Sequence, residues 1–314
     1  MPLQIVRDDI INVKADAIVN SANHKPIIGR GTDGAIYLAA GKDNLLAARK
    51  KIGVINFGDA KITPAFDLPA QFIIHTVAPI WNDGTSGEFG LLRSCYKNSL
   101  NLALENGCKS IAFPILATGV NNFPKAEALK IAVNEIQNFL FDHELFVLLA
   151  VFGKEIFDLS KKIFADVVEV TDDKFVAAAE LKEYSGGLKY LRGLQRLNIP
   201  DKNFGKNFSE QLLALIESRG LKNSEVYNAA NVSAKVFSDI RTKENYQPSK
   251  KTAIAFALAL ELPLDDTQNF LAAAGYTLSE AIELDAAIIS CIRRKIFDID
   301  AVNDELYAKN LPTF

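Results

Sequence analysis

The chain has 314 residues, 49% of them hydrophobic and 23% charged, and its formal net charge is −3. This length is enough for two domains with separate cores. The charge gives no support for a generally basic nucleic-acid-binding protein, so contact with nucleic acid would require a local basic patch. The longest apolar run, residues 145–152, suits a buried strand and is far too short to span a membrane.

The start of the chain lacks both the basic region and the apolar stretch of a signal peptide, so we expect a cytoplasmic protein without a membrane partner. Its three cysteines, Cys95, Cys108 and Cys291, are far apart, and we expect them to remain reduced. The cysteines and the three histidines show no metal-ligand spacing, so we expect no metal site.

Residues 1–170 alternate strand-like and helix-like segments, which predicts a three-layer α/β domain. Ligands of such domains bind outside the carboxyl ends of the strands, so the loops at those ends are the candidate site. The expected strands are residues 3–6, 15–20, 72–77, 110–114 and 145–152, and the expected helices are 91–104, 125–141 and 155–164.

Residues 16–41 combine a short buried strand, a glycine-bearing loop and the start of a helix. Such a combination directs free backbone N–H groups and the positive end of a helix dipole toward one point, which favours an anion. Asn23 and Asp33 flank the loop, so we expect a pyrophosphate over the loop and a sugar beside these two side chains. The expected parts are the strand 17–19, the glycines Gly29, Gly31 and Gly34, and the helix 35–40, which ends at Gly41.

Three more strand ends carry groups that suit the diphosphate or the base of a nucleotide. Residues 115–124 supply a second set of backbone donors for a diphosphate. Phe152 offers an aromatic ring on which a base can stack. Asp9 places a carboxylate beside the main-chain N–H of Ile10, a pair that suits the amino edge of adenine.

Several segments, taken in order, resemble macrodomains, and in particular the branch that hydrolyses mono-ADP-ribose esters and O-acetyl-ADP-ribose. The resemblance covers about residues 3–165 and implies an ADP-ribose pocket on a mixed sheet between helices, with no cofactor. The segments that carry it are Asp16–Asn23, Gly31–Ile36, Ile74–Trp81, Ile111–Pro114, Ala117–Val120 and Phe123–Pro124.

The resemblance also implies roles for individual residues. Asn23 and Asp33, ten residues apart as in that branch, would hold the proximal ribose and position the attacking water. Asp9 and Ile10 would hold adenine, and Phe152 would pack on it. The residues expected around the diphosphate and the rest of the ligand are Gly31, Thr32, Thr118, Gly119 and Val120, together with Asn20, Gly29 and Asn121.

The chain departs from the family pattern at two places. Arg30 interrupts the glycine run, where it either grips phosphate or points to solvent. Asn121 and Asn122 replace the usual aromatic-glycine pair, which removes a ring over the proximal ribose. The alternatives for Asp33 and Asn23 are a carboxylate that only stabilises the helix dipole and an ordinary turn residue.

Other aromatic residues near these segments have less specific patterns. His75 lies in an apolar strand, where we expect a hydrogen-bonded core histidine rather than a catalyst. His24 adjoins the expected site and is the better candidate for contact with substrate. We expect Trp81 and Phe89 to pack rather than to bind a ligand.

The second half of the chain is predicted to be all-helical. Residues 171–206 are expected to form a connector with one or two short helices. Residues 207–277 resemble the phage-repressor type of helix-turn-helix domain: a short helix, a tight turn and a second short helix, with supporting helices. The resemblance rests on Ser224–Tyr227, Val236–Ile240 and Pro248–Ser249. Residues 278–314 form a helical tail that packs on this module or pairs two chains into a homodimer.

A weak basic patch surrounds the expected recognition helix and offers possible phosphate contacts with DNA. The helix lacks the Arg, Asn and Gln side chains that usually read base edges, so binding of a protein partner or dimerisation is an equal alternative. The candidate nucleic-acid contacts are Lys235, Arg241, Lys243, Lys250 and Lys251.

Two functions are consistent with this pattern. The first is a hydrolase that removes mono-ADP-ribose from acidic side chains or deacetylates O-acetyl-ADP-ribose, targeted by the helical module. The second is a non-catalytic sensor of ADP-ribose, or of a related nucleotide, coupled to a DNA-binding transcriptional regulator. Removal of ADP-ribose from DNA bases is a third possibility that the helical half favours.

Overall fold

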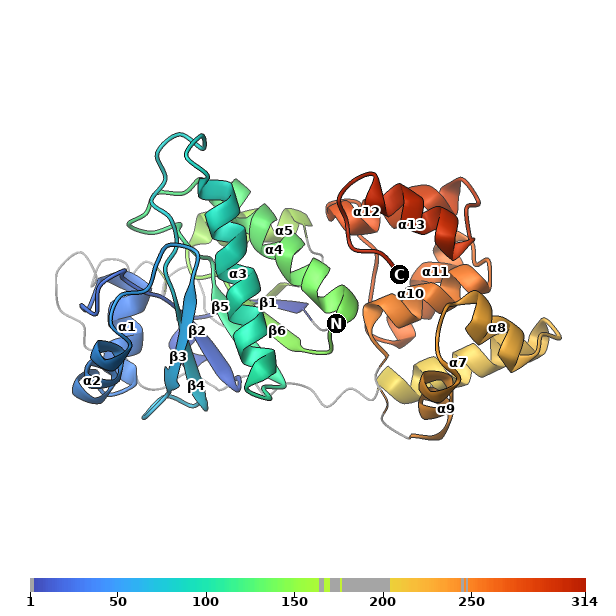
Figure 1. The fold of residues 1–314 in the computed structure, drawn as a ribbon, viewed down its shortest axis with the longest axis horizontal. Coiled ribbons are helices and arrows are strands. Elements are labelled where there is room, and N and C mark those ends of the chain that lie inside the picture. Colours follow the sequence, from blue (N-terminus) through green and yellow to red (C-terminus); the bar gives the residue numbers. More distant parts are fainter. Residues whose placement is uncertain (1–2, 164–166, 170–175, 177–203, 244–245, 247) are drawn as a thin grey trace. The chain divides into compact units, whose positions relative to one another are not determined.

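A computed structural model describes residues 3–163, 167–169, 176, 204–243, 246 and 248–314 (Figure 1). Two units are distinguished within it. Among the described residues, the α/β unit comprises 3–136, 145–163, 167–169 and 176, and the helical unit comprises 137–144, 204–243, 246 and 248–314. Most of the expected connector, residues 171–206, lies outside the described residues.

Seven strands form one sheet in the order β3-β4-β2-β5-β6-β1-β7. Strand β3 runs antiparallel to β4 and the other neighbours are parallel, so the expectation of a mixed sheet is confirmed. The strands are β1 (Leu3–Arg7), β2 (Ala17–Ser21), β3 (Ala60–Pro64), β4 (Phe72–Thr76), β5 (Ser110–Pro114), β6 (Phe146–Ala150) and β7 (Val167–Glu169).

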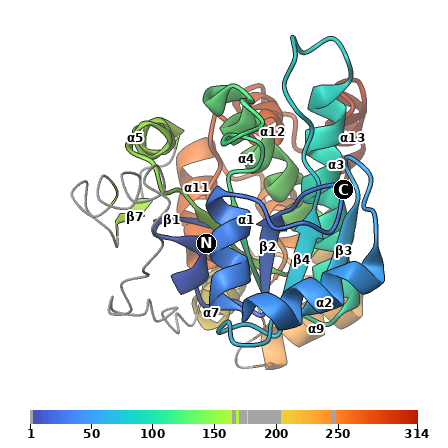
Figure 2. The same cartoon turned by 90° about the vertical axis from the view of Figure 1, so that its left-hand side faces the viewer.

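Helices cover both faces of the sheet, because successive side chains of a buried strand point to opposite faces. Ile18 and Ile73 pack with residues of α1 and α2 on one face. Tyr96 of α3 packs against Phe113 of β5 on the other, and Figure 2 shows α3 across the sheet from α1 and α2. The elements besides the strands are η1 (Ile10–Asn12), α1 (Gly31–Ala39), α2 (Lys42–Ile52), α3 (Glu88–Glu105), α4 (Lys125–Asp142) and α5 (Lys154–Ile163).

The structure differs from the expected elements at the start of α1 and at four elements that were not expected, η1, α2, β3 and β7. Helix α1 begins at Gly31 rather than Ala35, so Gly31 and Gly34 belong to its first turn instead of a loop. Asp33 stabilises this early start, because a carboxylate in the first turn interacts favourably with the helix dipole. Helix α2 and strand β3 were not predicted from the sequence.

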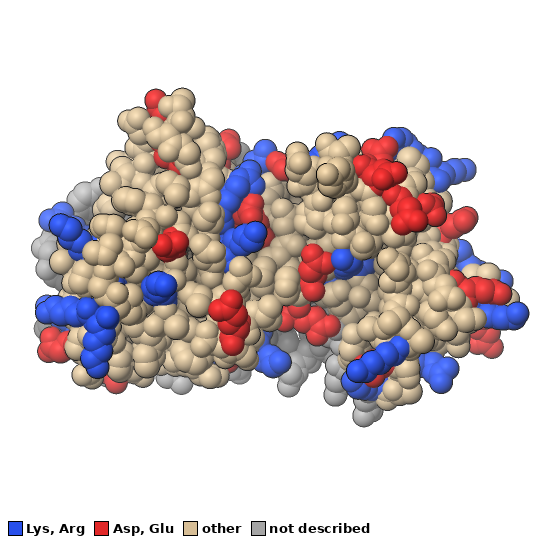
Figure 3. Space-filling view, in the orientation of Figure 1, with Lys and Arg blue, Asp and Glu red and all other residues tan. Residues whose placement is uncertain are grey.

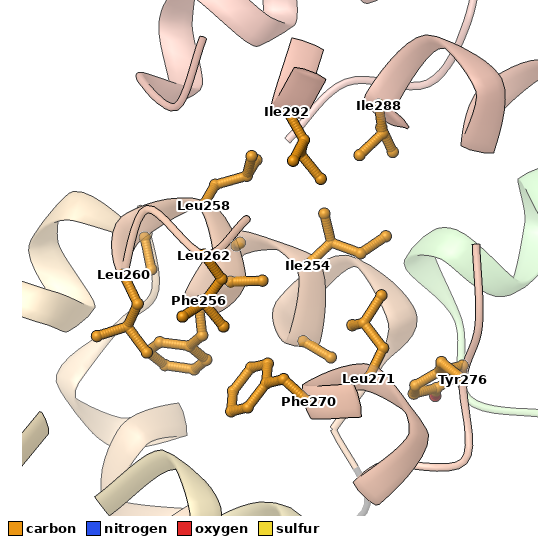
Figure 4. Close-up of a cluster of buried hydrophobic side chains, with 14 of the residues drawn as sticks. Ile254, Phe256, Leu258, Leu260, Leu262, Phe270, Leu271, Tyr276, Ile288 and Ile292 are labelled. Carbon is orange, nitrogen blue, oxygen red and sulfur yellow. The ribbon is translucent and has the colours of Figure 1, made fainter. Parts of the chain in front are cut away.

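The helical unit contains α7–α13 among the described residues, and the expectation of an all-helical second half is confirmed for them. All of these helices contribute buried apolar side chains to its core, and those of α10, α11 and α12 converge in Figure 4. The tail 278–314 contributes α12 and α13 to the same unit. The helices are α7 (Phe204–Ser218), α8 (Asn223–Ala229), α9 (Ala234–Thr242), α10 (Lys250–Ala259), α11 (Leu264–Ala273), α12 (Glu283–Arg293) and α13 (Ile299–Tyr307).

Within the described part of the chain, no helix combines the length and the apolar character needed to cross a lipid bilayer. The longest helices there are α3 and α4, and both carry charged side chains along their length.

Candidate functional site

The sheet order brings the four expected segments to one edge. Strands β2, β5, β6 and β1 are adjacent and parallel, so their carboxyl ends lie side by side. The segments that follow these strands carry Asn23, Thr118, Phe152 and Asp9 respectively. Residues separated by more than one hundred positions in the chain are therefore gathered along one edge, which is the position expected for a ligand in an α/β sheet.

Asn20 and His75 occupy facing positions in neighbouring strands. They are register partners in β2 and β4, and both side chains are fully buried. Asn20 Nδ2 donates to His75 Nδ1 at 3.2 Å, which places the ring proton of the neutral histidine on Nε2, 2.9 Å from Thr63 Oγ1. The expectation of a hydrogen-bonded core histidine is confirmed.

Asp33 is held from two sides in the first turn of α1. Its Oδ1 accepts from Asn20 Nδ2 at 2.7 Å, and its Oδ2 accepts from the main-chain N–H of Gly29 at 2.6 Å. Only 4% of the Asp33 surface is exposed. A buried network thus runs from Thr63 through His75 and Asn20 to Asp33, and it fixes the rotamer of the carboxylate.

Burial controls the titration of this network. Desolvation raises the pKa of Asp33, although the bonds from Gly29 and Asn20 and the charge of Arg49 oppose that rise. Desolvation, with a smaller effect of Arg49, lowers the pKa of His75 to about 3, so the ring stays neutral at physiological pH. A carboxylate with a raised pKa next to a neutral imidazole is suited to accept a proton.

Gly29 separates the two residues that the sequence singled out. A Cβ built on Gly29 would lie 2.7 Å from Asn23 Nδ2 and 3.0 Å from Asp33 Oδ2. Asn23 and Asp33 therefore flank one point, and only glycine fits between them. In this structure Asn23 Nδ2 donates to the carbonyl of Ile27 at 3.1 Å.

The segment after Asn23 is tied to the end of α2. His24 Nδ1 lies 2.6 Å from the carbonyl of Ile55, and the His24 ring stacks on Phe57. The guanidinium of Arg49 donates to the carbonyls of Asn23 and His24. Sequence reasoning missed Arg49 and Tyr37, both buried near Asp33; the spacing of four between Leu45 and Arg49 on one helix face was the available signal.

The loop 115–123 follows β5. Its residues Ala117 and Asn122 have left-handed backbone conformations. Thr118 Oγ1 donates to the carbonyl of Ile115, Gly119 has open space around its Cα, and Val120 is exposed. Asn121 Nδ2 donates to the carbonyl of Ala78 at 3.0 Å, so this amide holds the loop against residues 78–81. The loop is thereby shaped without the aromatic residue of the family pattern.

At the other end of the edge, Asp9 caps the short helix η1 by accepting from Ile11 N at 3.2 Å. Ile10 is buried, and Phe152 is partly buried after β6. Arg30 is exposed at the start of α1 and makes no capping bond.

Trp81 and Phe89 belong to an aromatic cluster with Phe123. The ring centroids of Trp81 and Phe123 are 4.7 Å apart, and those of Trp81 and Phe89 are 5.5 Å apart. These rings pack against one another, as the sequence predicted.

The helical unit contains two short helices, α8 and α9, joined by a tight turn. Asn231 in this turn is left-handed at φ 50°, and Ser233 caps α9 by accepting from Val236 N. Lys235 and Arg241 are exposed on α9, whereas Lys243 pairs with Asp239 at 3.0 Å. Over α9 in Figure 3, basic and acidic side chains lie together.

The structure corrects the expectation for Lys250. This residue is 1% exposed, and its Nζ lies 2.6 Å from Asp285 Oδ1, so it is part of the core and not available to nucleic acid. Lys250 is the first residue of α10 and lies on its buried face. The buried carboxylate of Asp285 compensates the positive charge of Lys250. Lys251 is half-buried and pairs with Asp142 at 2.9 Å.

Part of this chain matches a known protein family and several known proteins. Residues 19–132 match the family described as Macro domain. A macro domain-containing protein of Chlorobaculum tepidum is 46% identical over 140 residues, which cover 45% of this chain and 81% of that protein.

One further relative and one solved structure are also similar to part of this chain. An O-acetyl-ADP-ribose deacetylase of Citrobacter rodentium is 48% identical over 141 residues, covering 44% of this chain and 80% of that protein. A solved structure of the Oceanobacillus iheyensis macrodomain with ADP is 36% identical, covers 51% of this chain and 88% of its own, and has a TM-score of 0.49.

Proposed function

Because this chain belongs to the macro domain family, we propose that its α/β unit binds ADP-ribose and hydrolyses esters of it. The substrates proposed are mono-ADP-ribose on acidic protein side chains and O-acetyl-ADP-ribose. The observation that carries the proposal is the placement of Asn23 and Asp33 around Gly29 at the start of α1. Support from relatives comes from proteins named O-acetyl-ADP-ribose deacetylase, which match 44–46% of this chain.

The proposed binding mode assigns each segment of the sheet edge to one part of the ligand. The first turn of α1, with Gly31 and Thr32, and the loop Thr118–Val120 provide main-chain N–H groups for the diphosphate. Asp9 and Ile10 receive the adenine, and Phe152 packs on it. Asn20 Oδ1 is a buried acceptor without a hydrogen-bond partner among the described residues, which favours a nearby ligand hydroxyl or water as its donor.

In the proposed reaction Asp33 acts as the base. Its carboxylate takes a proton from water while the water oxygen bonds to the acyl carbon of the ester. The bond between that carbon and the ribose oxygen breaks, and the ribose oxygen receives the proton. Asn23 holds the proximal ribose through directional hydrogen bonds from its amide. Proton transfer by a positioned side chain contributes about 10²–10⁴-fold to such a reaction.

The test is turnover of defined substrates by the full chain. We expect release of ADP-ribose from an ester-linked mono-ADP-ribosylated protein, or of acetate from O-acetyl-ADP-ribose. Asp33→Ala is expected to abolish that turnover with the circular dichroism spectrum unchanged. Wild-type protein that binds ADP-ribose in calorimetry but releases no product from any substrate contradicts the hydrolase proposal.

A second candidate function is a sensor that holds ADP-ribose without hydrolysing it. The specific observation in its favour is that the amides of Asn23 and Asn121 are both engaged by main-chain carbonyls. An ester-linked, a serine-linked and a DNA-linked ADP-ribose substrate, assayed side by side, distinguish hydrolysis of each linkage from binding alone.

For the helical unit we propose targeting through a helix-turn-helix built from α8 and α9, with DNA as the ligand. The support is the tight turn at Asn231 and the exposed cations Lys235 and Arg241. Affinity for labelled duplex DNA should fall with salt, and Lys235→Ala or Arg241→Ala should each reduce the log–log slope by about one. Absence of salt-dependent binding would favour a protein partner, and light scattering would then test for a homodimer.

A further inference from the structure

Arg49 is a buried cation on the inner face of α2. Only 1% of its surface is exposed, and it lies on the same face of the helix as Leu45. Burial of a guanidinium is costly unless every donor finds a partner. The buried guanidinium of Arg49 must therefore have hydrogen-bond partners.

The guanidinium is satisfied by carbonyl groups from two separate segments. Nη1 donates to the carbonyl of Gly53 at the end of α2, where the helix dipole is negative. Nη2 donates to the carbonyl of Asn23 at 3.0 Å and, more weakly, to that of His24 at 3.4 Å. The side chain thus joins the end of α2 to the residue that directly precedes the site loop.

A second set of contacts closes the same junction. Ile55 N donates to the carbonyl of His24 at 3.1 Å, and His24 Nδ1 lies 2.6 Å from the carbonyl of Ile55. The main chain at Asn23 and His24 is consequently held by a charged donor, by one main-chain bond and by one contact of the His24 ring. Displacement of Asn23 requires rupture of these bonds.

The charge of Arg49 also acts on its buried neighbours. It interacts through space with Asp33 and with Tyr37, whose pKa burial raises to about 12. The other groups that face Asp33 are Asn20 and the N–H of Gly29, and His75 behind Asn20 is neutral. Arg49 is therefore the nearby cation that opposes the effect of burial on Asp33.

We propose that Arg49 is a positioning residue for the Asn23–Asp33 pair: its guanidinium fixes the main chain of Asn23, which lies across Gly29 from Asp33. The consequence for catalysis rests on the proposed function. A lysine keeps the charge but lacks the planar fork that reaches several carbonyls, so Arg49→Lys separates the charge from the positioning.

The experiment compares Arg49→Gln, Arg49→Lys and the control Lys51→Gln in the full chain. Lys51 is an exposed cation of the same helix, so its loss removes an equal charge outside the site. Three quantities are measured: the titration of the Asp33 carboxyl by ¹³C NMR, the hydrogen exchange of the Ile55 amide, and kcat and KM over pH.

In Arg49→Lys we expect the Ile55 amide to exchange faster and KM to rise, with kcat/KM lower by about tenfold and the Asp33 titration retained. Arg49→Gln should show the same changes in exchange and KM. Lys51→Gln should alter none of these quantities.

Unchanged Ile55 exchange and KM in Arg49→Lys overturn the proposal. If Arg49→Gln does not fold, Arg49→Lys still decides it. If the wild type shows no turnover, the proposed function fails, whereas hydrogen exchange of the Ile55 amide still tests Arg49.

Discussion

The main-chain N–H of Gly29 donates to Oδ2 of Asp33 at 2.6 Å, and this bond closes the loop onto the first turn of α1. The bond orients the carboxylate and, at the same time, lets Asn23 approach from the other side of Gly29. Geometry at this single glycine therefore controls both of the residues proposed for the reaction.

Gly29→Ala should impair turnover far more than folding. The added methyl would lie 2.7 Å from Asn23 Nδ2 and 3.0 Å from Asp33 Oδ2, so both side chains must move. Misplacement of reacting groups by about 1 Å can cost about a hundredfold in rate, and we expect a fall in kcat/KM of that order. Gly90→Ala is the control, because a methyl there meets nothing within 4 Å. Equal rates for the two variants would contradict the assigned geometry.

Asp33→Asn should remove a pH dependence of stability while it reduces kcat. Burial raises the pKa of Asp33, so the folded protein binds this proton more tightly than the unfolded chain does. The stability associated with the protonated group is complete below the unfolded pKa and is lost as pH rises through the folded pKa. Both carboxylate oxygens accept hydrogen bonds and an amide can keep only one of them, so the variant also carries a cost that does not titrate. Urea unfolding at several pH values should show that the stability of the variant relative to wild type is greater near pH 7 than in acid. A difference that stays constant over this range would refute this interpretation.

His75→Gln should remove part of the acid sensitivity of the fold. Burial lowers the pKa of His75 from 6.5 to about 3, so the unfolded chain takes up a proton below pH 6.5 while the folded protein does not. The folded state should thereby lose ~2 kcal/mol between pH 7 and pH 5. The difference between wild type and variant isolates this loss, since the other two histidines are common to both. Parallel stability curves for the two proteins over this interval would show that His75 is not the group responsible.

Lys250→Met should destabilise the helical unit strongly. The substitution leaves Asp285 buried without its ion-pair partner, and such a loss typically costs about 3–5 kcal/mol. Adding Asp285→Leu should recover most of the stability, because the double variant removes both charges. Lys251→Met removes an ion pair that is partly exposed and should cost less than about 1 kcal/mol. Denaturant unfolding followed by circular dichroism measures all three, and similar losses for Lys250 and Lys251 would argue against the buried pair.

Much of the fold followed from local pattern. The apolar runs at β5 and β6 and the helical periodicity of α4 appear in the sequence close to where the structure places them, because each element has a distinct spacing of apolar residues. Helix α2 was missed since its sequence is rich in charge and buries only Leu45 and Arg49. The local pattern predicts too late a start for α1, because Gly31 and Gly34 favour a loop over a helix.

The order of motifs along the chain was determined by the sequence alone: a strand, two asparagines, a glycine-bearing turn and Asp33 at a helix start are local features that need no partner. The tertiary structure decided which side chains from distant segments meet there. Strand order sets Asn20 beside His75, and the packing of α2 brings the charge of Arg49 to the carbonyl of Asn23. Such contacts depend on register and burial between segments far apart in the chain, which local spacing does not encode.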